Sequence, residues 1–152
     1  MKIYMDVCCY NRPFDDQNQD RIRLEAEAVM VILFNCQKGE WNLVSSDIVD
    51  IELRKTQNPI KKQKASLLAS IADSRVYLNE GIELKSNEYQ RLGIDLFDSL
   101  HIACAEESRA DIMLSTDDIL IKRAQKSKII KVRIENPVKW LMEVTDNNEN
   151  ND

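Results

Sequence analysis

Short apolar runs alternate with longer amphipathic segments along the chain of 152 residues. The apolar runs have the length of strands in a parallel sheet, both faces of which are buried. We predict strands at residues 3–5, 41–44, 76–78, 111–114 and 129–134. Apolar residues at helical spacing predict helices at residues 20–38, 47–53, 59–74, 82–91, 96–107, 118–127 and 137–144. This alternation predicts an α/β fold, a three-layer α/β/α sandwich around a mostly parallel central sheet.

Capping and turn residues set the expected boundaries of these elements. Asp20 is a candidate N-cap of the long helix, Gly39 follows the last turn of that helix, and Pro59 suits the first turn of another. Residues 11–16 are rich in turn formers and predict a loop. Residues 145–152 are almost entirely Asp, Asn and Glu, so we expect a disordered polar tail after a single domain of residues 1–144.

The long helix carries more apolar residues than one buried stripe needs. Residues 29–34 are all apolar, and Val31 and Phe34 lie off the stripe. Exposure of these side chains would forgo roughly 1.5–3 kcal/mol for each large one. Two interpretations stay open: another helix of the same chain covers them, or they form a surface for self-association into a homodimer.

Composition excludes several classes of protein. The three glycines are spaced too widely for a Walker loop or a dinucleotide fingerprint. The single histidine, His101, excludes a zinc site built from several histidines. The net charge of −5 argues against a strongly basic nucleic-acid binder, although a local basic face can still hold a phosphate backbone.

Cysteine usage and the N-terminal residues indicate a cytoplasmic protein. The cysteines form no Cys-x-x-Cys motif, and we expect reduced and mostly buried thiols at Cys8, Cys9, Cys36 and Cys104. An acid at position 6 comes too early for a secretory signal. No apolar run reaches the roughly 18 residues of a membrane span, so none is expected.

Acidic residues follow the predicted strands at the edge where a parallel sheet binds its ligands. Asp6 ends the first strand and Asp117 follows the fourth, while Glu52 and Asp98 lie on helices. Carboxylates gathered at one edge repel one another, and a divalent cation relieves this repulsion. A donor set of carboxylates and water suits Mg²⁺ or Mn²⁺.

Each of these acids also has an ordinary interpretation. Asp6 can form a turn, Glu52 can face solvent, and Asp98 and Asp117 can stabilise helix starts. Four independent residues of this kind would rarely meet at one edge, so the set as a whole favours a metal site.

Four segments are similar to those of the PIN domain, a metal-dependent ribonuclease fold, and the resemblance extends from Ile3 to about Val144. The family's aspartate helix has the pattern Asp, a small residue, Leu, His, an apolar residue, Ala, any residue and Ala. This pattern resembles Asp98-Ser99-Leu100-His101-Ile102-Ala103-Cys104-Ala105. The segment with the family's last acid has a Ser or Thr two residues before an Asp, which resembles Leu114-Ser115-Thr116-Asp117-Asp118-Ile119-Leu120. The opening strand resembles Ile3-Tyr4-Met5-Asp6, and residues 46–52 resemble the segment with the second acid. Size and acid order point to the bacterial VapC-type toxins.

The resemblance implies a metal-dependent endoribonuclease that acts on RNA, dimerises and is inhibited by an antitoxin protein. It implies that one or two Mg²⁺ or Mn²⁺ ions are held, directly or through water, by Asp6, Glu52, Asp98 and Asp117. The additional candidates for the site are Asp118, Asp95, Thr116 and His101. The family often has Asn or Ser two residues after the first acid, where this chain has Cys8.

His101 lies one turn from Asp98, so the two side chains share a helix face. It is either a general base or a structural residue that supports the site, and its apolar neighbours favour the second role. A run of basic residues forms either an RNA-facing patch or an ordinary solvated helix face; these residues are Arg54, Lys55, Lys61, Lys62 and Lys64.

Two other functions compete with the ribonuclease. A catalytically inactive PIN-like module would bind RNA or protein without cutting, and the intact acid set argues against it. A phosphoaspartate receiver also has an acidic pocket in an α/β fold. Receivers usually have paired acids at the first strand, whereas Asp6 follows Met5 here.

Overall fold

Five strands form one central sheet in a computed structural model that describes residues 1–151, with side chains described through residue 147. The strands are β1 (Lys2–Met5), β2 (Asn42–Ser46), β3 (Ser74–Val76), β4 (Ile112–Leu114) and β5 (Ile134–Glu135). Every neighbouring pair is parallel, and the order across the sheet is β3-β2-β1-β4-β5. The all-parallel arrangement explains why the strands read as short apolar runs rather than alternating patterns.

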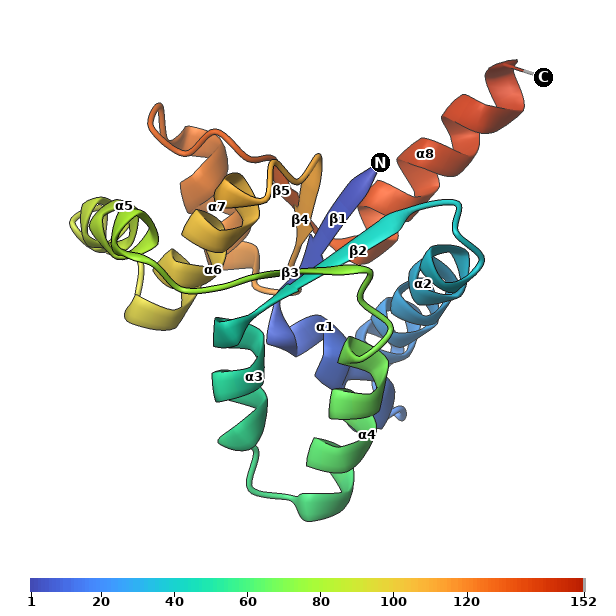
Figure 1. The fold of residues 1–152 in the computed structure, drawn as a ribbon. Coiled ribbons are helices and arrows are strands. Elements are labelled where there is room, and N and C mark those ends of the chain that lie inside the picture. Colours follow the sequence, from blue (N-terminus) through green and yellow to red (C-terminus); the bar gives the residue numbers. More distant parts are fainter. Residues whose placement is uncertain (152) are drawn as a thin grey trace.

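Helices cover both faces of the sheet, which confirms the three-layer sandwich. One layer contains α5 (Glu80–Gln90), α6 (Leu96–Glu107) and α7 (Asp118–Lys126) (Figure 1). The other contains α1 (Val7–Asn11), α2 (Asp20–Gln37), α4 (Pro59–Ala69) and α8 (Pro137–Asn151). The remaining helix, α3 (Asp47–Arg54), extends from the carboxyl end of β2.

The strand order reverses between β1 and β4. From β1 the chain steps to β2 and then to the edge strand β3, before α5 and α6 carry it back to β4 on the other side of β1. Connections therefore leave β1 and β4 in opposite directions, which opens a crevice at their carboxyl ends. This crevice is where the chain places Asp6 and the segment from Ser115 to Asp117.

The core lies on both sides of the two central strands. Residues 3–5 of β1 and 112–114 of β4 are at most 1% exposed. Trp140 of α8 packs edge-on against Trp41 at the start of β2, with ring centroids 5.0 Å apart. This contact anchors the last helix to the sheet.

Several predicted elements are confirmed. The helix at residues 96–107 has the predicted bounds, and Ser46 caps α3 by accepting a hydrogen bond from the backbone N–H of Val49. The long helix begins at Asp20, with Gln19 rather than Asp20 in the N-cap position. Gly39 follows α2 with a φ of 86°, a conformation in which glycine is favoured.

Other boundaries were predicted wrongly. Residues 11–16 are not simply a loop, because α1 runs to Asn11 and a 3₁₀ helix follows at Arg12–Phe14, with Pro13 in its first turn. The helix that begins at Pro59 ends at Ala69 instead of residue 74, since Ser74–Val76 pairs with β2 as a strand.

The last strand is shorter than predicted, and the last helix is longer. Only Ile134–Glu135 pairs with β4, because the backbone N–H groups of Lys131 and Val132 donate to the Glu106 carboxylate instead. The helix α8 continues past residue 144 to Asn151, through most of the segment for which a disordered tail was expected. Asp152 lies outside the described residues.

The surplus apolar residues of α2 face outward. Phe34 is 59% exposed and Val31 is 46% exposed, so no other helix among the described residues covers them. The interpretation of burial within the chain is therefore wrong for this pair. A search of the described residues finds no helix long and apolar enough to cross a membrane.

Candidate metal centre

Asp6 is the buried acid at the carboxyl end of β1. Its backbone N–H donates to the carbonyl of Leu114 at 2.9 Å, which continues the ladder between β1 and β4 past their last residues. The Asp6 side chain is nearly buried, and the Ser115 hydroxyl donates to its Oδ2 at 3.0 Å. The parallel pairing therefore fixes Asp6 against the segment that follows β4.

Glu52 and His101 reach the same point from two helices. His101 of α6 is fully buried, and its Nε2 lies 2.6 Å from Glu52 Oε1 and 3.8 Å from Asp6 Oδ1. Asp6, Glu52 and His101 each offer one possible ligand atom, and the three atoms lie within 4.8 Å of one another. The structure thus brings together two of the predicted acids and the single histidine.

A second group of acids lines a small cavity of about 160 Å³. Asp95, Asp98 and Asp117 all lie in its wall, together with Gly93 and Arg123. Asp95 caps α6 by accepting from the backbone N–H of Asp98 at 2.9 Å, and this places Asp98 in the first turn of the helix. Asp117 caps α7 by accepting from the backbone of Ile119 at 3.0 Å. Asp117 therefore has the capping role that the sequence left open, whereas the N-cap of α6 is Asp95 rather than Asp98.

The two groups interact electrostatically. Burial and then the charges of Asp6, Asp95 and Asp117 together raise the pKa of Asp98 to about 8, against a lowering by His101. The pKa of Asp6 is also raised, first by burial and then by Glu52, while His101 and Ser115 oppose the rise. Asp98 is thus poorly accommodated as an anion beside the other acids.

These residues fit a hard divalent cation. The carboxylate oxygens of Asp6 and Glu52 are the kind of donor that Mg²⁺ and Mn²⁺ prefer, and the cluster contains no thiolate. The pKa values of Asp6 and Asp98 are raised first by burial and then by neighbouring acids. A cation at this point would favour the ionised form of both carboxyl groups.

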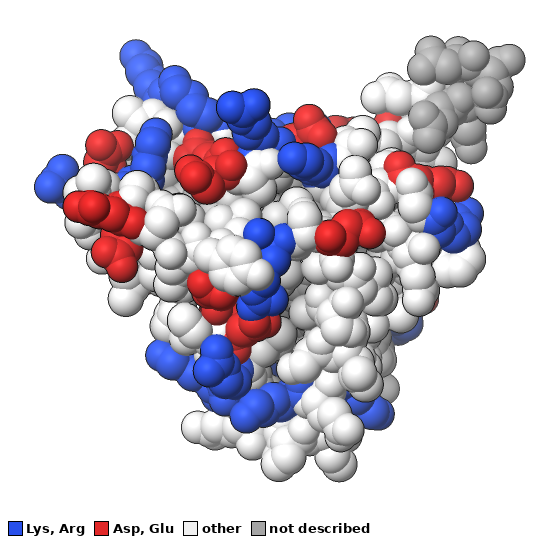
Figure 2. All heavy atoms as spheres, in the orientation of Figure 1, with Lys and Arg blue, Asp and Glu red and all other residues white. Residues whose placement is uncertain are grey.

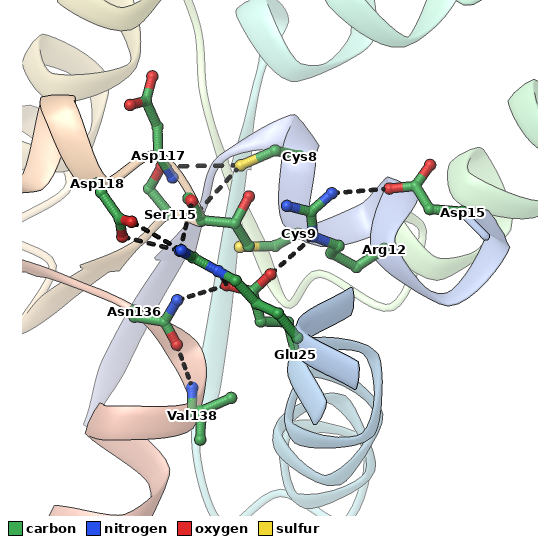
Figure 3. Close-up of polar contacts among 12 residues, drawn as sticks. Cys8, Cys9, Arg12, Asp15, Glu25, Ser115, Asp117, Asp118, Asn136 and Val138 are labelled. Atoms are coloured by element: carbon green, nitrogen blue, oxygen red, sulfur yellow. Dashed lines mark hydrogen bonds and ion pairs between the residues drawn. The ribbon is translucent and has the colours of Figure 1, made fainter. Parts of the chain in front are cut away.

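Asp118 and Thr116 take part in a different set of contacts. The guanidinium of Arg21 donates to both oxygens of Asp118, at 2.7 and 2.8 Å, and to the carbonyl oxygen of Thr116 at 3.3 Å. This ion pair lowers the pKa of Asp118. In Figure 3 the Asp117 carboxylate points away from Asp118, so the two adjacent acids have separate environments.

A buried glutamate that the sequence analysis missed organises the neighbouring region. Glu25 of α2 is 1% exposed and accepts from Arg12 at 2.9 Å, from Asn136 at 2.6 Å and from Arg21 at 3.3 Å (Figure 3). Arg12 also pairs with Asp15 at 3.0 Å. The network joins α2 to the segment before α8 and, through Arg21, to the turn that carries Asp117. An acid on the apolar face of α2 was the available signal.

Cys8 lies where the PIN family often has Asn or Ser. Its sulfur accepts a weak hydrogen bond from the backbone N–H of Thr116 at 3.3 Å and lies 3.7 Å from the Ser115 hydroxyl (Figure 3). The thiol therefore links α1 to the segment after β4. All four cysteines of the chain are free thiols, as expected.

The basic residues of α3 and α4 have mixed environments. Lys and Arg gather at the lower end of the molecule in Figure 2, where Figure 1 places the end of α3 and the start of α4. Lys61 is paired with Asp15, and the ammonium groups of Lys55 and Lys64 lie over the rings of Phe97 and Phe14 at 4.4 and 5.9 Å. Arg54 is exposed and Lys62 is partly buried.

Comparison with known proteins identifies the fold. No family model matches the chain, and no curated protein matches it. A chain from the structure of VapBC2 from Rickettsia felis, bound to a DNA fragment from their promoter, aligns with a TM-score of 0.59 and 17% identity. A chain from the structure of VapBC-1 from nontypeable Haemophilus influenzae aligns with a TM-score of 0.56 and 20% identity. Each alignment covers 90% of this chain and 98% of the other, and together they show the PIN-like fold that the sequence predicted.

We expect Mg²⁺ or Mn²⁺ to raise the melting temperature, because binding to the folded state alone stabilises it by mass action. At about 100 times the dissociation constant, the rise should be roughly 5–10 °C. The rise should be larger at about pH 8 than at about pH 6, because protons compete with the metal for a carboxyl group whose pKa is about 8.

The melting temperature of the metal-free protein should fall as the pH rises. A carboxyl group with a raised folded-state pKa favours folding while it is protonated, and this contribution is lost as the pH rises from about 4 toward 8. Differential scanning fluorimetry of the wild type checks both trends. Asp98→Asn removes the carboxyl group concerned, and Glu107→Gln at the far end of α6 is its control. A melting temperature unmoved by metal at every pH would contradict a metal centre.

Proposed function

We propose that the chain is a metal-dependent endoribonuclease of the PIN family, which hydrolyses RNA phosphodiesters and acts as the toxin of a toxin–antitoxin pair. The observation that carries the proposal is the cluster of Asp6, Glu52 and His101 at the carboxyl ends of β1 and β4, where the strand order reverses. Asp98 lies close enough for the charge of Asp6 to raise its pKa. The shared fold and the Asp98–Ala105 segment support the choice of family.

In this proposal Asp6 and Asp98 are the principal ligands of Mg²⁺ or Mn²⁺, and Glu52 and Asp117 complete the acidic set. When bound, the ion lowers the pKa of water and stabilises charge on the phosphate oxygens. Asp117 is a better fourth acid than Asp118, because Arg21 already neutralises Asp118. Asp95 holds the first turn of α6 and thereby places Asp98.

The remaining residues position the substrate and the site. Exposed cations on α3 and α4 would contact RNA phosphates on either side of the cleaved bond. Arg54, Lys55 and Lys64 are the most accessible of them. The contacts of Lys61 with Asp15 and of Lys64 with Phe14 would hold this part of the surface in shape.

Replacing Asp98 with Asn tests the catalytic proposal. The substitution keeps the shape of the side chain but removes a charge from the acidic set, so metal-dependent RNA cleavage should fall more than about 100-fold. Cleavage of a mixed RNA population, followed by gel electrophoresis with Mg²⁺, Mn²⁺ or a chelator, provides the measurement. Glu107→Gln, an exposed acid at the other end of the same helix, should leave cleavage unchanged.

Full metal-dependent cleavage by folded Asp98→Asn would overturn the assignment of this residue. A wild-type chain that binds RNA or protein but cleaves nothing in any metal would favour the inactive PIN-like module instead. Circular dichroism on each variant separates loss of activity from loss of fold.

The exposed apolar face of α2 supports a protein partner. Leu24, Met30, Val31 and Phe34 are 44–59% exposed on this one helix, which is more apolar surface than isolated exposed residues account for. The two structures with the same fold are of VapBC assemblies, which favours an antitoxin as a partner of this chain. We propose that the α2 face also supports a homodimer in the absence of that partner.

The dimer proposal is checked by light scattering. The wild type should have a mass near twice 17.6 kDa, and Phe34→Glu should convert it to monomer by placing a charge in the contact. Leu84→Glu is a matched control, because Leu84 is 60% exposed on α5 in the opposite layer (Figure 1). A monomeric wild type at high micromolar concentration would exclude the α2 face as a stable dimer contact.

A further inference from the structure

Both ring nitrogens of His101 are held by hydrogen bonds inside the protein. Nε2 lies 2.6 Å from Glu52 Oε1, and Nδ1 lies 2.6 Å from the hydroxyl of Tyr4. The Tyr4 hydroxyl in turn lies 2.7 Å from the hydroxyl of Ser46. Tyr4, Ser46 and His101 are all completely buried, and only the Glu52 end of this chain of contacts is partly exposed.

The donors and acceptors in this chain have one consistent direction for a neutral imidazole. An ionised carboxylate can only accept, so Nε2 must carry the proton that bonds to Glu52. Nδ1 then has a lone pair and accepts from the Tyr4 hydroxyl, whose oxygen accepts from Ser46. The Ser46 oxygen accepts from the backbone N–H of Val49 at 3.3 Å, which ends the chain at the first turn of α3.

This chain joins the elements that carry the acids of the metal centre. Tyr4 lies two residues before Asp6 on β1, Ser46 begins the helix that carries Glu52, and His101 lies one turn after Asp98 on α6. A shift of any of these elements would break a buried hydrogen bond, which costs more than an exposed one. These hydrogen bonds therefore fix the position of Glu52 relative to Asp6.

We propose that Tyr4 is a positioning residue, which selects the Nε2–H form of His101 and so holds Glu52 in place to bind a divalent cation. The inference rests on the proposed metal centre and adds that His101 is not itself a ligand. A nitrogen that carries a proton has no lone pair for a metal, and the other nitrogen accepts from Tyr4.

A second buried tyrosine of the protein supplies a matched control for this role. Tyr10 is also completely buried, but its hydroxyl has no hydrogen-bond partner in the described part of the chain. Tyr4→Phe and Tyr10→Phe therefore remove the same atom from two buried rings, and only the first removes a contact with His101. An effect due to packing alone would appear in both variants.

The form of His101 is measured by long-range ¹H–¹⁵N correlation spectroscopy. His101 is the only histidine, so each spectrum contains one imidazole. Burial lowers the pKa of His101, but the hydrogen bond to Glu52 and the charges of Asp6 and Asp98 raise it overall, so spectra are recorded at increasing pH until the imidazole is neutral. The neutral imidazole of the wild type should have a proton on Nε2 and a bare Nδ1, both with and without Mg²⁺. A neutral imidazole with its proton on Nδ1 would overturn the proposal, and a loss of the Nε2 proton on addition of Mg²⁺ would show that His101 is a ligand.

The variants test the consequence for metal binding. By isothermal titration calorimetry, Tyr4→Phe should weaken Mg²⁺ or Mn²⁺ binding by about 10-fold or more, and its His101 should no longer show the Nε2–H form alone. Tyr10→Phe should bind metal as the wild type does. Equal affinity in Tyr4→Phe and wild type would overturn the positioning role.

These outcomes separate the inference from the function on which it rests. A wild type that binds no metal would defeat the metal centre, whatever form His101 takes. A wild type that binds metal with Nδ1 protonated would leave the metal centre standing and defeat the role of Tyr4. The spectrum of the wild type alone decides which groups donate and which accept along these hydrogen bonds, even if Tyr4→Phe fails to fold.

Discussion

The burial of carboxylates beside one another is the constraint on which the rest of this structure depends. Asp6 is nearly inaccessible, and its charge is opposed by burial and by Glu52. The protein offsets only part of this cost, through the Ser115 hydroxyl that donates to Asp6. The cation of the proposed metal centre would balance the charge that remains.

The surrounding fold keeps these groups together by linking elements that are distant in sequence. Pairing of β1 with β4 sets Asp6 beside Ser115, and Cys8 adds a weak contact with Thr116. The buried carboxylate of Glu25 joins arginines from two segments to the region before α8 (Figure 3). Each link crosses between layers or strands, so the geometry of the site is a property of the whole sandwich rather than of one loop.

The sequence predicted the parallel sheet and the long helices because burial sets the spacing of apolar residues within each strand and helix. This spacing is visible in a short stretch of sequence. It also predicted that Asp6, Glu52, Asp98 and Asp117 would lie near one edge of the sheet, where the carboxyl ends of parallel strands meet. The structure brings Asp6 and Glu52 together with His101, which was an additional candidate. It could not predict the Tyr4–Ser46, Glu25–Asn136 and Arg21–Asp118 contacts, because each of them joins residues 42–111 positions apart. The short strand at Ile134–Glu135 and the extension of α8 were missed for a related reason, since edge pairing and helix ends depend on tertiary contacts such as those of Glu106.

The central claim, that these acids form a metal centre, is tested most directly by locating the ion. Crystals of the protein grown with Mn²⁺ allow the metal to be found by its anomalous scattering, independently of any assay of activity. The account predicts a peak in contact with carboxylate oxygens of Asp6 and Asp98. A well-ordered site without Mn²⁺, or a peak held only by acids outside this crevice, would contradict it.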